Sequence, residues 1–465
     1  MDKKIIRGAS EHDLLYIMNP KCGWCTKQDP IVDELKKDGH KITILDFNNP
    51  NDMKRINEVK AKYNAQCGTP HFIDAKTGNQ ICGFREKDDL KKWAQGEEVE
   101  VPEPPQRPTQ KKYKLEYVWI DGNDSVRSKV RYSNIFHLPN EILSVDKVPS
   151  WSFDGSSTNQ SDTIDSDLLL NPIRLFPNPM ESRQTPSWYV FCEVLNVDGT
   201  AHESNSRKKL WEALQDNREQ NIWVGIEQEY VITNSTTGKP FGWEDYDKEI
   251  PPIQGDYYCG VGNDKQKGRM VAEQHALLCT QSNLSYEGFH PEVMLSQWEY
   301  QIGPGNPLDI ADQLWFSRFL LQRTTERSPH PVSVTYDSKL VDGDWNGSGA
   351  HINFSTNYMR NSANLEYMNV ICSAFAESHD KAINSYGKDN NKRLTGEHET
   401  SSINTFTWGE NDRSVSIRIP SSTVTNDGKG YLEDRRPSAS MNPYEALTYL
   451  VSTISEISEE LLVTT

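Results

Sequence analysis

The sequence predicts an α+β protein built from three folded units, on the strength of three observations. The first 95 residues alternate short apolar runs with helical segments in the order βαβαββα. Residues 96–112 hold four prolines and four glutamates and almost no apolar side chains. After this break, residues 113–200 contain short strands separated by many turn residues, and residues 201–465 alternate helices with strands that carry Glu and Arg.

The first unit is expected to be a small sheet with helices between its strands. The apolar runs are short enough for strands, and the polar segments between them have helical spacing. The expected elements are a strand at 14–18, a helix at 22–37, a strand at 42–47, a helix at 51–64, two short strands within 71–84 and a helix at 86–94.

The Pro- and Glu-rich segment is expected to be a linker. A segment with so few apolar residues cannot form a core, and Pro-rich chains behave as stiff spacers. We therefore expect three units, at residues 1–95, 113–200 and 201–465, with the linker at 96–112. The second of these is expected to be an antiparallel sheet.

The overall composition disfavours two classes of partner. The chain carries 50 Lys and Arg against 67 Asp and Glu, a net charge of −17, and an acidic chain gains nothing from counterion release on nucleic acid. No apolar run reaches the ~18 residues of a membrane span, and the start lacks a secretory leader. We expect a cytoplasmic protein that binds neither nucleic acid nor membrane, with the six scattered cysteines as buried, reduced thiols.

The remaining two cysteines form a dithiol motif, Cys22-Gly-Trp-Cys25, directly after a strand and at the start of a helix. The partial positive charge of a helix N-terminus favours a thiolate at Cys22, and the spacing places Cys25 on the same face. A zinc half-site and an inert docking module are the alternatives. Residues 1–95 resemble the thioredoxin/glutaredoxin family, in which the proline after Thr69 is cis and packs against the dithiol.

Carboxylates recur on the strands of the last unit. Glu227 and Glu229 are two residues apart in WVGIEQEYVI, so they share one face of a strand, where like charges are unfavourable unless a cation lies between them. Glu292, Glu299 and Glu433 lie in similar apolar surroundings, and His351 follows a Gly-rich run. A lone histidine is usually a core residue, but these glutamates together with a histidine favour a divalent-metal site.

Arginines accompany these carboxylates at Arg393, Arg413, Arg418 and Arg435. A guanidinium beside an apolar strand needs a planar anionic partner such as a carboxylate or phosphate. Structural ion pairs would explain any one of them alone. The whole set predicts phosphoryl transfer, and because the sequence contains no Walker or kinase glycine loop, the nucleotide must be held in another way.

From Tyr117 to Pro443 the chain is similar to the glutamine synthetase family of the eukaryotic type. The matching strings are WIDG (119–122), FDGSST (153–158), GIEQEY (225–230), YYCGVG (257–262), QWEYQIGP (297–304), WNGSGAHINFS (345–355), RSVSIRIP (413–420) and GYLEDRRPSA (430–439). The resemblance implies a β-grasp domain followed by an incomplete antiparallel barrel flanked by helices. It also implies stacked pentameric rings of identical subunits, with active sites between neighbouring subunits.

The implied reaction joins ammonia to the side-chain carboxylate of glutamate, using ATP and passing through γ-glutamyl phosphate. Its implied site residues fall into four groups. Mg²⁺ or Mn²⁺ would be held by Glu229, Glu292 and Glu299 at one position and by Glu227, His351 and Glu433 at the other. ATP would contact Trp223, Asn353, Ser355, Arg360, Arg418 and Tyr431. Glutamate and its transferring phosphoryl group would contact Gly347, Arg393, Arg413 and Arg435. Ammonium would be held by Asp154 and Glu399, with Asp154 taking its proton.

Three departures from the family stand out, and three rival functions remain. His290 and Pro291 stand where the family more often has Asn and a small residue, Ser-Pro-His-Pro at 328–331 looks like a short insertion, and the dithiol unit is foreign to the usual family member. The rivals are a γ-glutamyl ligase for another amine, a catalytically silent assembly protein, and a thiol-disulfide oxidoreductase with a regulatory ligase-like domain. Asp154 and Glu399 favour ammonium because two carboxylates suit a small cation.

Overall fold

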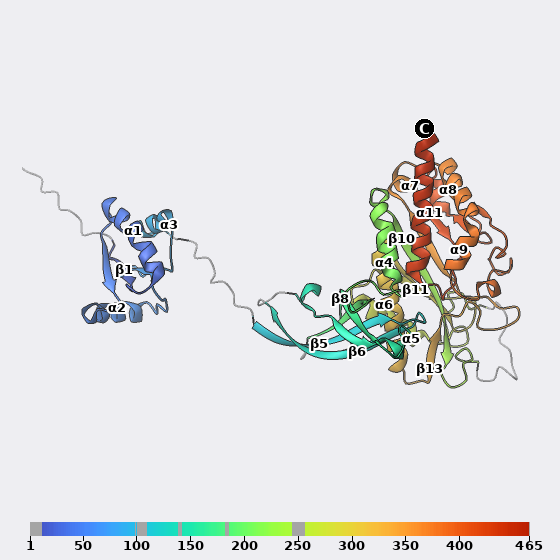
Figure 1. Cartoon of the computed structure of the whole chain (residues 1–465), viewed down its shortest axis with the longest axis horizontal. Helices are drawn as coiled ribbons and strands as arrows, with labels where there is room; N and C mark the ends of the chain where they lie inside the picture. The colour runs from blue at the N-terminus through green and yellow to red at the C-terminus, as the bar shows by residue number, and fades with distance from the viewer. Residues whose placement is uncertain are drawn as a thin grey trace, which may run out of the picture. The chain divides into compact units, whose positions relative to one another are not determined.

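The computed structural model describes residues 12–97, 99, 109–137, 142–181, 186–243 and 256–464. The chain divides into two compact units, Met1–Arg107 and Pro108–Thr465 (Figure 1). The predicted linker at 96–112 lies largely outside the described residues. Among the described residues, no helix combines the length and the apolar character needed to cross a membrane.

The N-terminal unit has the predicted βαβαββα order, which is thereby confirmed. Its elements are β1 (Leu14–Met18), α1 (Gly23–Lys37), β2 (Ile42–Asp46), α2 (Pro50–Lys62), β3 (His71–Asp74), β4 (Gln80–Cys82) and α3 (Lys87–Ala94). In the described part of this unit the strand order is β2-β1-β3-β4, with β1 parallel to β2 and the other pairs antiparallel.

Strand alternation sets the two faces of this sheet. Leu14 and Tyr16 pack in one apolar cluster with α1 and α3, whereas Leu15 and Ile17 pack in another with α2. Successive side chains of a strand point to opposite faces, so one five-residue strand supplies both clusters. The dithiol segment enters α1 at the end of this central strand.

The expectation of six buried, reduced cysteines is wrong for three of them. Cys67 and Cys82 form a disulfide, and Cys259 is exposed, while the other three are buried free thiols. The cause is the β3–β4 hairpin, which brings residues 15 positions apart into contact. Sequence spacing alone carries no sign of that pairing.

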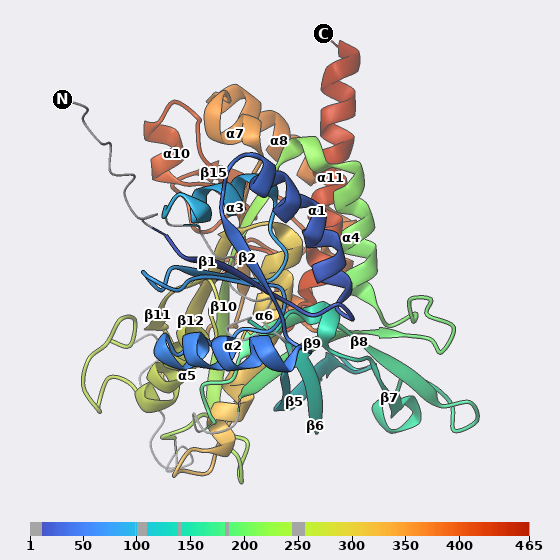
Figure 2. The ribbon, with the colours of Figure 1, turned by 90° about the vertical axis from the view of Figure 1, so that its left-hand side faces the viewer.

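The second sheet, in residues 109–195, was expected to be antiparallel, but one of its strand pairs is parallel. Its strands are β5 (Thr109–Ile120), β6 (Val126–His137), β7 (Trp151–Asp154), β8 (Asp167–Pro177) and β9 (Ser187–Leu195). Over the described residues they run in the order β6-β5-β9-β8-β7, and β5 pairs with β9 in parallel. The long β8–β9 hairpin returns the chain beside β5 in the same direction. The strand β7 is last in this order and so lies at the edge of the sheet (Figure 2).

The large sheet of the C-terminal unit carries the predicted carboxylates. Its strands are β10 (Trp223–Asn234), β11 (Tyr286–Pro291), β12 (Gln297–Gly305), β13 (Val332–Thr335), β14 (Ala350–Ser355), β15 (Trp408–Glu410), β16 (Ile417–Ile419) and β17 (Leu432–Asp434). In the described residues the order is β11-β12-β10-β14-β17-β16-β15, and β13 pairs with β10. The pairing is antiparallel except between β15 and β16.

The described part of the C-terminal unit also contains helices. They are α4 (Ser206–Asp216), α5 (Arg269–Gln281), α6 (Pro307–Glu326), α7 (Asn357–Asn361), α8 (Leu365–Glu377), α9 (His379–Ser385), α10 (Ser421–Thr425) and α11 (Pro443–Thr464). Helix α11 contacts α4, α6, α8 and α9, as Figure 1 shows. On β10, Val224 and Ile226 join the apolar core, so Glu227 and Glu229 lie on the opposite face of the sheet.

Candidate active site

Strand register gathers the charged residues on one face. Glu229 lies opposite Glu299 on β12, and Glu227 lies opposite His351 on β14. Asn353, two residues further along β14, lies opposite Glu433 on β17. Directly opposed residues of antiparallel strands project to the same side. These side chains therefore meet, and all but Asn353 line a polar cavity of about 580 Å³, which we call the charged cavity.

One metal-type cluster in the charged cavity consists of Glu227, His351 and Glu433. His351 Nδ1 lies 3.5 Å from Glu227 Oε2 and 3.5 Å from Glu433 Oε1. One ligand atom from each of the three lies within 4.8 Å of the others. Carboxylate oxygens with one imidazole nitrogen are a donor set for Mg²⁺ or Mn²⁺. The structure thus brings together the three residues expected at the second metal position.

A second cluster in the same cavity consists of His290, Glu292 and Glu299. His290 Nε2 lies 3.0 Å from Glu292 Oε1, and His290 Nδ1 lies 3.9 Å from Glu299 Oε1. Glu229 also lines the cavity, but its Oε2 accepts hydrogen bonds from Gln297 Nε2 and the Gly349 N–H, both at 2.9 Å. The sequence reasoning missed His290 as a ligand, although it singled out that position as a departure from the family.

The carboxylates of the charged cavity are costly to ionise without a cation beside them. Burial, followed by repulsion from Glu292, raises the pKa of Glu229 to about 8. Burial also raises the pKa of Glu299 well above its ordinary value, and the charges of Glu227 and Glu229 add to the effect. A divalent ion would offset this cost of ionising clustered, buried carboxylates. The residues therefore fit a divalent metal.

The predicted arginines line the same charged cavity and contact its carboxylates. Glu433 is bonded by Arg418 Nη1 at 2.6 Å and by Arg435 Nη1 at 2.7 Å. Arg435 also donates to the carbonyls of Arg413 at 3.0 Å and Glu399 at 3.3 Å, which ties two loops to β17. The charged cavity is also lined by Arg393, Arg413, Glu399 and Gly347.

Arg393 is the most deeply held of these cations. It is buried, its Nη2 donates to the carbonyl of Arg435 at 2.9 Å, and the same nitrogen lies 3.1 Å from His351 Nε2. Burial lowers the pKa of Arg393 to about 10. The guanidinium is thus fixed before any substrate enters.

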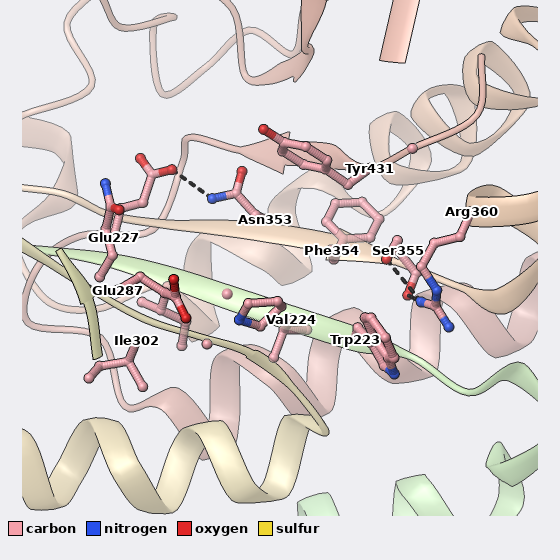
Figure 3. Close-up of a pocket in the computed structure, with 16 residues that line it drawn as sticks. Trp223, Val224, Glu227, Glu287, Ile302, Asn353, Phe354, Ser355, Arg360 and Tyr431 are labelled. Carbon is pink, nitrogen blue, oxygen red and sulfur yellow. Dashed lines mark hydrogen bonds between the residues drawn. The ribbon is translucent and has the colours of Figure 1, made fainter. Parts of the chain in front are cut away.

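A second cavity of about 410 Å³, the aromatic cavity, adjoins the first. Five residues predicted for ATP line it: Trp223, Asn353, Ser355, Arg360 and Tyr431. Arg360 Nη1 donates to Ser355 Oγ at 3.0 Å, and its guanidinium lies 4.3 Å from the centre of the Trp223 ring (Figure 3). The aromatic rings of Trp223 and Tyr431 and the positive charge of Arg360 suit a purine carrying phosphates.

The two cavities meet at Glu227 and Gln301, which line both. Glu227 Oε1 accepts a hydrogen bond from Asn353 Nδ2 at 2.6 Å (Figure 3). Arg418, predicted for the phosphates, lines the charged cavity instead of the aromatic one. Sequence reasoning missed Glu287 and Gln301 in the aromatic cavity, and no sequence signal marked them.

Asp154 is not brought to either cavity among the described residues of this chain. It ends the edge strand β7, and its carboxylate accepts from Ser156 Oγ and Ser157 Oγ, both at 2.7 Å. These two hydrogen bonds hold the pKa of Asp154 well below its ordinary value, and the bond from Ser157 has the larger effect. Glu399, the expected partner of Asp154, follows Gly396 in the loop that borders the charged cavity.

The dithiol of the N-terminal unit forms a separate site. Cys22 caps α1, and its Sγ donates to the carbonyl of Thr69 at 3.3 Å, beside a cis Thr69–Pro70 bond. A hydrogen bond from the backbone of Cys25 lowers the pKa of Cys22, whereas burial raises the pKa of Cys25. The pair therefore combines a readily ionised thiol with a buried one.

Known proteins match this chain over most of its length. The family described as "Glutamine synthetase, catalytic domain" matches residues 204–461. Glutamine synthetase of Xenopus laevis is 42% identical over 354 residues, 74% of this chain and 86% of that protein. The Canis lupus familiaris protein of the same name is 41% identical over 360 residues, 76% of this chain and 93% of its own length. A solved structure of Plasmodium falciparum glutamine synthetase shares the fold, with a TM-score of 0.57, 17% identity and coverage of 75% of this chain and 72% of that one. This chain belongs to the glutamine synthetase family.

Proposed function

We propose that this chain joins ammonia to the side-chain carboxylate of glutamate at the expense of ATP, releasing glutamine, ADP and phosphate. The observation that carries this proposal is the meeting of the two cavities at Glu227 and Gln301. A nucleotide in the aromatic cavity would present its terminal phosphate to the arginines and carboxylates of the charged cavity. That geometry is what a direct phosphoryl transfer to a carboxylate needs.

Two divalent ions, Mg²⁺ or Mn²⁺, would be held in the charged cavity. One would be held by the cluster of Glu227, His351 and Glu433. The other would be held by Glu292 and Glu299 together with Glu229, which lines the same cavity, with His290 as a further candidate ligand. When bound, such an ion neutralises the charge of the terminal phosphate so that a carboxylate can approach it.

The chain's own residues carry the remaining steps. Arg360 and Arg418 orient the phosphates, and Arg393 with Gly347 positions glutamate. The glutamate carboxylate attacks the terminal phosphorus, the bond to ADP breaks, and γ-glutamyl phosphate forms. Arg413 and Arg435 stabilise the charge of the transferring group.

The second half of the reaction brings in ammonia. Ammonium would be held between Asp154 and Glu399, and the lowered pKa of Asp154 keeps its carboxylate ionised to attract this cation. Asp154 would take the proton that ammonium loses as its nitrogen approaches the acyl carbon. The resulting ammonia attacks the acyl carbon, and phosphate leaves. The loop that carries Glu399 closes over the intermediate and excludes water, which would otherwise hydrolyse it.

Phosphate release is the direct test. Release should require ATP, glutamate and ammonia together, and the glutamine formed should equal the phosphate released. A panel of alkylamines and polyamines assayed beside ammonia separates this proposal from the rival γ-glutamyl ligase. Faster turnover with any larger amine would overturn the choice of ammonia.

His290 leads to a prediction on metal preference. An imidazole ligand binds transition-metal ions more tightly than Mg²⁺. His290, acting as a ligand beside Glu292 and Glu299, should therefore raise the affinity for Mn²⁺ relative to that for Mg²⁺. We expect His290→Asn to lower the Mn²⁺-to-Mg²⁺ affinity ratio by about tenfold, roughly 1.4 kcal/mol. Free Mn²⁺ measured by electron paramagnetic resonance, with Mg²⁺ as competitor and no substrates, gives this ratio.

The matched control is His330→Asn, because His330 is an exposed histidine outside both metal clusters. It should leave the ratio unchanged. An unchanged ratio in His290→Asn as well would show that His290 is not a ligand.

We infer a second activity, thiol-disulfide exchange, for the N-terminal unit, as in the thioredoxin/glutaredoxin family. The readily ionised Cys22 beside Thr69 supports this assignment and makes Cys22 the attacking thiol. We expect Cys25→Ser in the full chain to trap a mixed disulfide with a disulfide substrate, and Cys22→Ser to trap none. Mass spectrometry of the trapped adduct checks this, and the reverse pattern would exchange the two roles.

An inert docking module would trap nothing in either variant. A second experiment tests whether the dithiol also regulates the ligase. Phosphate release is measured before and after treatment with dithiothreitol, both in the unaltered chain and in the Cys22→Ser variant. A change confined to the unaltered chain would support regulation through Cys22.

A further inference from the structure

A second group of thiols in the N-terminal unit lies beside a buried histidine. Cys67, His71 and Cys82 each offer one ligand atom, and the three atoms lie within 4.8 Å of one another. His71 lies directly opposite Cys82 in the β3–β4 pair, so the two side chains share one face. Cys67 reaches the same place from the loop before β3 and is joined to Cys82 in the disulfide.

His71 keeps one ring nitrogen without a hydrogen-bond partner. Its side chain is fully buried at 0% exposure, and the nitrogen without a partner is Nδ1. Its Nε2 lies 3.0 Å from Gln80 Oε1, which can only accept, so Nε2 carries the proton and Nδ1 keeps a lone pair. A metal-binding histidine characteristically donates its other ring N–H to such an acceptor.

The spacing of the two cysteines suits a metal ion as well as a disulfide. Their Cα atoms are 5.9 Å apart. Two Zn–S bonds of ~2.3 Å at a tetrahedral angle need sulfurs about 3.8 Å apart, within reach of the same two side chains. Both cysteines are partly exposed, so water can complete a tetrahedron of two sulfurs, one nitrogen and one oxygen.

We propose that Cys67, Cys82 and His71 form a Zn²⁺ site in the reduced protein, which the Cys67–Cys82 disulfide replaces in the oxidised protein. A dithiol reductant supplies two electrons and two protons to the S–S bond and becomes a disulfide itself. Zn²⁺ then binds the two sulfurs and His71 Nδ1, displacing both thiol protons to solvent. A disulfide oxidant reverses the sequence: it takes two electrons from the two thiolates and two protons from solvent and becomes a dithiol, while the S–S bond re-forms and Zn²⁺ is released.

Co²⁺ binding to the full-length chain tests the proposal. The reduced chain should develop a thiolate-to-cobalt charge-transfer band that saturates at one equivalent per chain and disappears when Zn²⁺ is added. The oxidised chain, which has the same sequence and fold, should show no such band. The ligase cavity does not interfere, because its clusters hold only carboxylates and imidazoles.

Variants then show which residues bind the Co²⁺ that gives the charge-transfer band. Cys67→Ser and Cys82→Ser should each abolish it, whereas the double variant Cys22→Ser, Cys25→Ser should keep it. Gln80→Ala should weaken Co²⁺ binding about 10–100-fold, and Gln80→Glu, which keeps an acceptor oxygen, should restore it. Thermal unfolding of each variant confirms that it is folded.

Three results would overturn the proposal. They are a reduced chain without a band, a band that survives Cys67→Ser, and a band that is lost in the Cys22, Cys25 double variant. The last would place the metal at the helix-capping dithiol instead.

Discussion

Asp154→Ala and Glu433→Ala assemblies, each inactive alone, should recover about a quarter of wild-type activity when they are unfolded together and reassembled in equal amounts. We propose that the subunits form the stacked pentameric rings of the family. Asp154 ends an edge strand and lines neither cavity among the described residues, whereas Glu433 is in the wall of the charged cavity. Under this proposal, a site that needs both residues would be completed by the sheet of residues 109–195 from a neighbouring subunit.

The expected fraction follows from random mixing. Each site would pair the sheet of residues 109–195 of one subunit with the charged cavity of its neighbour. In an equal mixture, half of these sheets keep Asp154 and half of the cavities keep Glu433. One site in four then combines two intact halves, provided that the contact is heterologous and closes into a ring. Phosphate release, measured on assemblies sized by light scattering, gives the recovered fraction.

Each variant unfolded and reassembled alone is the control and should stay inactive. Complete absence of activity in properly sized mixed assemblies would place Asp154 and Glu433 in the same subunit's site. The ligase proposal would survive that result, since the unmixed wild type tests it independently.

The second large effect is expected at Arg435. Removing one preorganised charge from the site of a transferring group costs about 10²–10³ in rate. Arg435→Ala should lose that much turnover and still fold, because Glu433 keeps its bond to Arg418 at 2.6 Å. Turnover at saturating substrates and the free energy of unfolding, measured on the same preparation, check both statements.

The adjacent Arg436 provides a matched contrast. It is 1% exposed, pairs with Asp434 at 2.6 Å and lines neither cavity among the described residues. Truncating it leaves a buried carboxylate without its partner, which costs about 3–5 kcal/mol of stability. Arg436→Ala should therefore lose stability first and activity as a consequence. Near-normal turnover in Arg435→Ala would remove Arg435 from the reaction.

The sequence predicted most of the local structure because the relevant signals are local. The alternation of Val224 and Ile226 with Glu227 and Glu229 predicts which face of β10 is charged, and the structure places the first pair in the core. The N-terminal elements came from periodicity in the same way. Local signals do not encode which strands become neighbours, so the parallel β5–β9 pair was not foreseen.

The residues that sequence reasoning missed all depend on contacts between distant segments. His290 becomes a candidate ligand only because β11 pairs with β12 and brings it opposite Glu299. Cys67 and Cys82 meet only through a hairpin, and nothing in their spacing predicted it. The predicted metal and nucleotide residues, in contrast, came from a resemblance that covers whole motifs.

Glu227 and Gln301 line both cavities, so an occupant of one cavity and an occupant of the other would contact the same side chains. The Glu227 carboxylate bonds Asn353 on the aromatic side and lies near His351 on the charged side. An occupant on one side that draws Glu227 towards itself changes the contacts available on the other, and so changes the affinity there. Such a coupling is reciprocal by necessity: whatever factor the nucleotide imposes on binding in the charged cavity, an occupant of that cavity imposes on the nucleotide.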